Sequence, residues 1–357
     1  MLKRKLLFLV LLPPLFLTGC WDRKDPEDRA YIITLGVDAA PDGCTFTFAP
    51  ANMGAGEGET YTADARTLAE AVAQVDTRTS RKTELGQLKT VILSQSLLEE
   101  GGQLDSFLRE LERSQTVSEK VMLLATEDSA ADCVEAVLAE DSQTGLFLWD
   151  FYKNTAREVA VTKGMDLDTF LTERTEQGGN GVLPRISAKE KKLQLGGGLA
   201  VAGDRAYPLE NEEERGYLFL LGEAEGALLE GEYQGETIPL EIGKSRVRYD
   251  FSVEADGFLL CTVTLPLEGT LQGGEGAFLS ARTQQELTAL FADIIKSEIE
   301  HTITIAEDAG EDLFGILPRL YQQMPQAAEG RSREELWSAL RFEIWPELQL
   351  KDMGRKR

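Results

Sequence analysis

The stretch RVRYDFSV at residues 246–253, followed by LLCTVTL at residues 259–265, alternates polar and apolar side chains. This alternation predicts two antiparallel strands with one solvated face, joined by a turn at Asp256-Gly257. From Thr283 to about Ala306, apolar residues recur at helical spacing, so a long helix is predicted to cover the other face of the sheet. The stretch therefore predicts an α+β arrangement for the last third of the chain.

Another alternating run, from Phe342 to Leu350, predicts a closing strand. Pro346 lies within it, and a proline cannot donate a backbone hydrogen bond, so this strand is expected at an edge or a bulge. Together these patterns define a predicted C-terminal α+β domain at residues 229–357.

The first half of the chain predicts strands interleaved with helices. The expected strands are 31–38, 44–48, 88–93 and 120–125, the first two forming a hairpin around Pro41-Asp42-Gly43, and the expected helices are 65–75, 104–111 and 131–138. Helical crossovers between strands favour parallel pairing, so residues 20–180 are predicted to form an α/β domain. A helical stretch at 146–170 holds Phe147, Trp149, Phe151 and Tyr152, which favours a core or a seam between domains over a binding surface.

Glycine-rich passages suggest two further boundaries. Gln177 to Gly181 is the best candidate linker, and Gly222 to Gly235 marks a second boundary. Between them, Leu193 to Ala202 predicts a strand pair around three glycines, and Glu210 to Leu221 predicts a helix with glutamates near its positive end. These features predict a small middle domain at residues 181–228. The expected fold class is α+β and multidomain, each domain being a mixed or antiparallel sheet flanked by helices.

The first nineteen residues are typical of a secretory signal peptide. Lys3, Arg4 and Lys5 precede an apolar run that is too short to span a bilayer. The run ends in Leu17-Thr18-Gly19-Cys20, the pattern of a bacterial lipobox. We expect recognition by the signal peptidase at Leu17, Thr18 and Gly19, cleavage before Cys20, and lipidation of the Cys20 thiol, giving a membrane-anchored protein on the extracytoplasmic face. The alternative is an ordinary signal peptide with a chance cysteine.

The composition narrows the choice of partners. The chain holds 37 Lys+Arg and 61 Asp+Glu, a net charge of −24, and loss of Lys3, Arg4 and Lys5 with the signal leaves −24 − 3 = −27. This charge disfavours nucleic acid and anionic lipid as partners. After lipidation three cysteines remain, Cys44, Cys133 and Cys261, and their apolar surroundings favour buried free thiols over a single disulfide.

No catalytic, metal-ligating or cofactor-binding residue emerges from the motifs. The single histidine, His301, has no neighbour that would complete a triad or a zinc site. Gly243-Lys244-Ser245 lacks the first glycine of a P-loop, because Ile238 occupies that position, and Val201 breaks a dinucleotide-binding pattern. Glu212-Glu213-Glu214 is typical of a solvated face. We therefore expect a protein that is not an enzyme and holds no cofactor.

Several stretches resemble the Ger(x)C family, the C-subunit lipoproteins of spore germinant receptors. They are Leu17 to Arg23, Ile33 to Asp38, Gly86 to Ser94, Leu104 to Arg113, Lys120 to Ala125, Pro208-Leu209, Glu213-Glu214-Arg215-Gly216, Asp312-Leu313-Phe314-Gly315, and Trp337 with the closing strand. The resemblance implies a non-enzymatic subunit with three domains of sheet and flanking helix. It also implies a lipid-anchored position on the inner spore membrane beside two integral membrane receptor subunits, of the A and B types, and a part in the nutrient germination response.

Two other functions stay open from the residues alone. One is a lipid-anchored solute-binding or transport accessory protein, which would bind a small ligand saturably. The other is an extracytoplasmic enzyme, for which a screen of hydrolase activity is the test.

Overall fold

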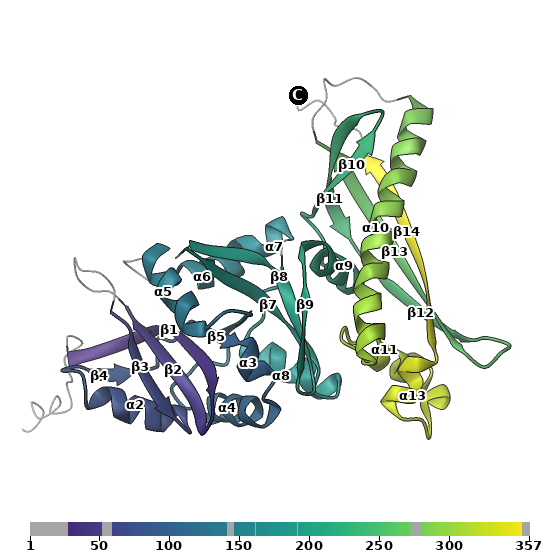
Figure 1. Cartoon of the computed structure of the whole chain (residues 1–357). Coiled ribbons are helices and arrows are strands. Elements are labelled where there is room, and N and C mark those ends of the chain that lie inside the picture. The colour runs from purple at the N-terminus through teal and green to yellow at the C-terminus, as the bar shows by residue number, and fades with distance from the viewer. Residues whose placement is uncertain are drawn as a thin grey trace, which may run out of the picture.

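The computed structural model describes residues 28–51, 59–140, 146–160, 162–190, 192–272 and 280–351. These residues form a nine-stranded and a five-stranded sheet, each flanked by helices (Figure 1). The expected signal peptide with Leu17, Thr18, Gly19 and Cys20 lies outside the described residues. Among the helices that are described, none has the length and apolarity needed to cross a bilayer.

The first sheet has the strand order β3-β2-β1-β5-β6-β7-β8-β9, with β4 beside the start of β1. Its strands are β1 (Arg29–Ala40), β2 (Gly43–Pro50), β3 (Tyr61–Ala65), β4 (Lys82–Glu84), β5 (Thr90–Ser94), β6 (Met122–Thr126), β7 (Gly181–Lys189), β8 (Lys192–Ala202) and β9 (Arg205–Leu209). The predicted β1–β2 hairpin is confirmed, and so is the parallel pairing, which joins β1, β5, β6 and β7.

Helices cover both faces of this sheet. One face carries α2 (Leu68–Asp76), α3 (Gln95–Leu98), α4 (Gly101–Arg113) and α8 (Leu167–Glu176), and the other carries α5 (Ala130–Glu140), α6 (Phe147–Asp150), the π-helix η3 (Phe151–Thr155) and α7 (Ala156–Val159). Side chains of a strand alternate between faces, so Val91 and Leu93 of β5 join the first cluster while Ile92 joins the second. The aromatic stretch is divided accordingly: Tyr152 is buried in the second cluster, whereas Phe147 is 40% exposed.

The second sheet is built around a long central strand. Its elements are β10 (Leu228–Tyr233), β11 (Glu236–Ser245), β12 (Arg248–Val253), β13 (Leu259–Leu271) and β14 (Leu340–Lys351), with α10 (Ala281–Ala309), α11 (Ile316–Gln323), α12 (Pro325–Ala328) and α13 (Arg333–Ser338). The predicted hairpin is β12–β13, and the predicted long helix is α10, which buries Phe291, Ile295 and Ile299. β14 pairs with β13 alone among the described strands, in parallel, so Pro346 lies on an edge strand as expected.

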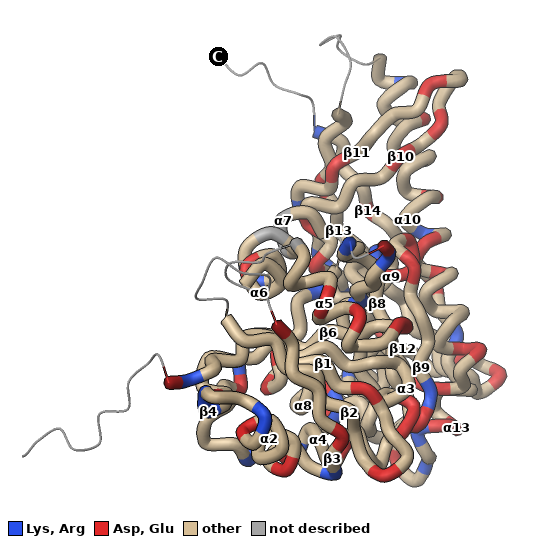
Figure 2. The backbone as a smooth tube through the Cα atoms, turned by 60° about the vertical axis from the view of Figure 1, so that its left-hand side comes forward, with Lys and Arg blue, Asp and Glu red and all other residues tan. Residues whose placement is uncertain are grey.

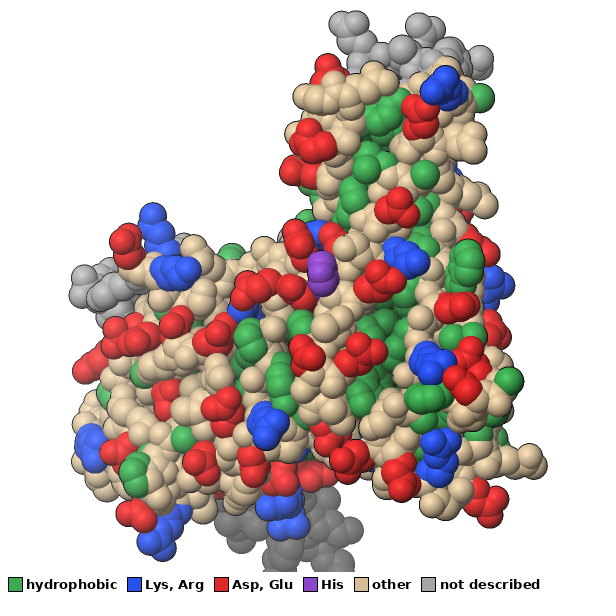
Figure 3. Space-filling view, turned by 45° about the vertical axis from the view of Figure 1, so that its right-hand side comes forward, with side chains coloured by type: hydrophobic (Ala, Val, Ile, Leu, Met, Phe, Trp, Pro, Cys, Tyr) green, Lys and Arg blue, Asp and Glu red, His purple; other side chains and the backbone are tan. Residues whose placement is uncertain are grey.

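Helix α9 (Asn211–Leu221) joins the two sheets. It packs on α10 and on β8, and its apolar cluster reaches Val182, Ala200 and Leu209 of the first sheet. The structure thus confirms the α+β class. Acidic positions are spread over both sheets and their helices (Figure 2), and His301 lies exposed on α10 at the surface (Figure 3).

The expected middle segment is organised differently from the sequence pattern. Leu193 to Ala202 is one continuous strand, not a strand pair, because Gly197 with a φ of +73° accommodates an irregularity in the β7–β8 ladder instead of a turn. Within the described chain, residues 181–228 have no separate sheet of their own: β7 to β9 continue the first sheet through one residue pair, Ala125 and Arg185. The domain boundaries themselves remain predictions.

Candidate functional site

The first residues of helix α9 contact two parts of the chain, the first sheet and helix α10. We call this region the junction, and it is the candidate functional site. Glu214 is only 1% exposed. The expectation that Glu212-Glu213-Glu214 forms a solvated face is therefore wrong at its third residue. The helix carries its glutamates in its first turn, as predicted, but successive residues of a helix point about 100° apart, so one of three adjacent carboxylates is directed inward.

The Glu214 carboxyl is buried with few polar partners. Its Oε1 accepts from the Thr162 hydroxyl at 3.1 Å and from the Lys163 amide at 3.3 Å, whereas Oε2 has no hydrogen-bond partner among the described residues. Oε2 packs against Gly198 of β8, where a Cβ would overlap it. Burial raises the pKa of Glu214 to about 7, because these two contacts only partly replace water around the charged form.

The next two residues of α9 face α10. The Arg215 guanidinium forms a two-bonded ion pair with Glu298, with Nε 2.9 Å from Oε2. Gly216 lies directly against α10, since a Cβ there would overlap the Thr302 hydroxyl and approach the Glu298 carbonyl oxygen to 2.6 Å. A glycine at this position allows the two helix backbones to pack closely.

A second contact joins the end of α8 to the loop before α11. The buried Asp312 carboxylate accepts from the backbone amides of Ile316 at 2.9 Å and Leu317 at 2.7 Å, which fixes the start of α11. Asn180 donates its side-chain amide to the Asp312 carbonyl oxygen at 3.1 Å, and Arg333 donates to the Gln177 carbonyl oxygen at 2.8 Å.

The predicted linker, Gln177 to Gly181, is therefore a packed joint. Asn180 is 3% exposed and Gln177 is 9% exposed. The glycine-rich composition predicted a linker. In the structure, Gly178 and Gly179 have positive φ values of 72° and 102° in the turn that leads from α8 into β7, a backbone conformation that glycine adopts without strain.

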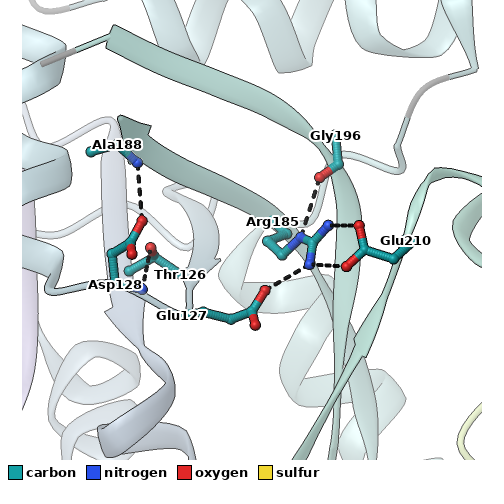
Figure 4. Close-up of polar contacts among 7 residues, drawn as sticks. All are labelled: Thr126, Glu127, Asp128, Arg185, Ala188, Gly196 and Glu210. Carbon is teal, nitrogen blue, oxygen red and sulfur yellow. Dashed lines mark hydrogen bonds and ion pairs between the residues drawn. The ribbon is translucent and has the colours of Figure 1, made fainter. Parts of the chain in front are cut away.

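Arg185 anchors the junction from the first sheet (Figure 4). Its guanidinium binds Glu210 through two parallel bonds, at 2.9 and 2.7 Å, and Glu127 at 2.6 Å. Glu210 directly precedes α9, so Arg185 ties the start of that helix to the end of β6. Hydrogen bonding by Arg185 lowers the pKa of Glu210 below its ordinary value, as expected for a carboxylate held by a guanidinium.

The chemistry available at this junction is that of structural ion pairs. Within the described ranges, no group of His, Cys, Asp and Glu side chains is arranged to hold a metal ion. Cys44, Cys133 and Cys261 are buried free thiols, and burial raises their pKa values to about 11, 11 and 12, which disfavours the reactive thiolate.

Comparison with known proteins places the chain in a family. A family model described as the spore germination protein N-terminal domain matches residues 22–188, and one described as spore germination B3/GerAC-like, C-terminal, matches residues 197–354. Together they cover most of the chain. It belongs to the Ger(x)C family of spore germination proteins.

Individual relatives of this Ger(x)C chain are distant in sequence. The spore germination protein GerQC of Bacillus cereus is 28% identical over 200 residues, which cover 55% of this chain and only 54% of that relative. YfkR of Bacillus subtilis strain 168 is 22% identical over 302 residues, covering 78% of this chain and 77% of that protein. The crystal structure of the GerBC protein matches at a TM-score of 0.59 and 14% identity, over 88% of this chain and 96% of that one, and so shows the same fold.

Two of the stretches that suggested Ger(x)C membership lie at the junction. Glu214, Arg215 and Gly216 contact the first sheet and α10, while Asp312 and Gly315 shape the loop before α11. The sequence patterns gave no indication of Arg185 and Glu298, the partners of Glu210 and Arg215. No local pattern distinguishes these residues from surface charges, because their burial depends on elements more than 20 residues away along the chain.

Proposed function

We propose that this Ger(x)C protein is a lipid-anchored, non-enzymatic subunit of a nutrient germinant receptor. The observation that carries the proposal is the pair of family matches over residues 22–188 and 197–354. The lipobox-like Leu17 to Cys20 directly before the first match adds the anchor. The charged side chains of the junction are engaged with one another and with the backbone, which agrees with a structural and non-catalytic use of these residues.

The proposal places the protein at the inner spore membrane beside integral membrane subunits of the A and B types. An anchor confines the body to a thin layer near such partners, so weak contacts suffice for assembly. The name of the relative GerQC, a spore germination protein, agrees with this role.

The test is replacement of Cys20 with Ala in a spore-forming host that lacks this gene. We expect loss of the acylated N-terminus by mass spectrometry, release of the protein from the membrane fraction, and a reduced response to nutrients with an unchanged response to non-nutrient germinants. Cys133→Ala, which removes a buried thiol of the body, is the matched control and should keep the anchor. Finding the wild-type chain unacylated, or a normal nutrient response in a deletion strain without a paralogue, would contradict the proposal.

A further inference from the structure

The end of the first domain at which β1 begins is also the end nearest to the proposed anchor. Strands β1, β5 and β6 run parallel, so all three begin at this end of the sheet. Nine residues lead from Cys20 to Arg29, and an extended chain covers at most about 3.5 Å per residue, or about 30 Å in all. If Cys20 carries lipid, as proposed above, this end of the domain must lie within that distance of the bilayer.

A group of exposed cations lies at this end. Arg78, Arg81 and Lys82 are exposed, and none of the three forms an ion pair with a carboxylate in the part of the chain that is described. Lys82 is in β4, which pairs with the first residues of β1. The neighbouring Glu84 is already paired with Arg29. Residues 78–82 thus hold three cations and no acid, in a chain whose net charge is −24.

Aromatic residues lie over the start of the neighbouring strands. Lys89 directly precedes β5, and its Nζ lies 5.6 Å from the centre of the Trp149 ring. The Nζ of Lys153 lies 4.1 Å from the same ring. Phe147, two residues before Trp149, is 40% exposed. Tryptophan and phenylalanine beside lysine is the composition found where proteins meet the headgroup region of a bilayer.

We propose that this tether-side end of the domain, which carries Arg78, Arg81 and Lys82 beside the α2 face of the sheet and Phe147, Trp149 and Lys153 on the opposite face, contacts an anionic lipid bilayer and sets the orientation of the anchored protein. After removal of the signal the protein has a net charge of −27, so an anionic bilayer repels it in most orientations. The contact therefore requires the tether, which holds this end of the domain close enough to the bilayer for its exposed cations to attract anionic headgroups. The second sheet lies on the far side of the first domain from the start of β1, so it is directed away from the bilayer (Figure 1).

The test measures which end of the protein meets the lipid. The full lipidated chain, purified in detergent, is reconstituted into phosphatidylcholine vesicles with or without phosphatidylglycerol and with a headgroup-attached nitroxide quencher. An environment-sensitive fluorophore is placed at Phe147→Cys or, as the matched control, at Asp42→Cys in the exposed β1–β2 turn at the opposite end of β1. The native cysteines of the body are buried and stay unlabelled.

We expect quenching at position 147 that requires phosphatidylglycerol and falls at high salt, and little quenching at position 42. Reversing the charges of Arg78, Arg81 and Lys82 to Glu should shift the contact equilibrium by at least about fivefold for each residue. Reversing Arg246, Arg248 and Arg282 in the second domain changes the net charge equally and should leave the quenching unchanged; circular dichroism confirms that both variants fold.

The outcomes separate the two proposals. Vesicle flotation of the wild-type chain, lost in Cys20→Ala, tests the anchor. An anchored protein that is quenched equally at positions 147 and 42, or whose quenching is indifferent to the charge reversal, overturns the orientation while leaving the anchor intact.

Discussion

Replacing Glu214 with Gln is expected to change how the stability of the protein depends on pH. The carboxyl has an ordinary pKa of 4.5, and burial raises it to about 7 in the folded chain. Below pH 4.5 the Glu214 carboxyl is neutral in both the folded and the unfolded state, so its ionisation does not lower the free energy of unfolding. Between pH 4.5 and 7 the unfolded chain releases its proton and the folded chain retains it, so stability falls as pH rises and levels off above 7.

The size of this effect follows from the pKa difference. A pKa that is raised from 4.5 to about 7 on folding lowers the free energy of unfolding by about 3 kcal/mol at high pH. This loss is fully expressed near pH 8. Glutamine has nearly the same shape and no charge. Its carbonyl oxygen can accept from Thr162 and Lys163 as Oε1 does. The variant should therefore lack this pH-dependent loss.

The assay is urea unfolding of wild type and Glu214→Gln at intervals from pH 5 to 8. Other titrating groups contribute equally to both proteins, so the difference between their unfolding free energies isolates Glu214. We expect this difference to shift by about 2 to 3 kcal/mol in favour of the variant as pH rises. Glu212→Gln, on the exposed side of the same helix turn, is the control and should show no such shift. Parallel pH profiles for wild type and Glu214→Gln would refute the reasoning.

Three further substitutions test the rest of the junction. Gly216→Ala should lower the free energy of unfolding by about 2 to 4 kcal/mol, because the added methyl group overlaps α10. Thermal melts measure this loss, and Gly102→Ala, which has open space around it, is the control that should not destabilise the protein. Arg185→Met should cost about 1 to 2 kcal/mol, because the carboxylates that it binds are largely exposed, and it should increase amide hydrogen exchange at the start of α9, where Glu210 loses both its bonds. An unchanged exchange rate would contradict the anchoring role of Arg185. Asp312→Ala removes the acceptor for the first amides of α11 and should cost about 2 kcal/mol in urea unfolding, while Asp308→Ala, exposed near the end of α10, should cost little.

Much of the secondary structure could be predicted from the sequence. The alternation at 246–253 and 259–265 and the helical spacing after Thr283 correspond to β12, β13 and α10. These predictions succeed because the spacing of apolar residues indicates which side chains are buried on one face of an element, and this spacing is a local property of each element. The lipobox at Leu17 to Cys20 is likewise a local chemical pattern, and it remains a prediction about the anchor.

Tertiary structure decided how glycines and charges are used. Gln177 to Gly181 has the composition of a linker, yet Asn180 is buried against the Asp312 loop. Glu214 belongs to an acidic run, yet it alone of the three is buried at this junction, because packing of α9 between β8 and α10 encloses one side of the helix. The composition of a segment describes its average polarity. The burial of each residue depends on which distant element packs against it, and only the folded chain determines this packing.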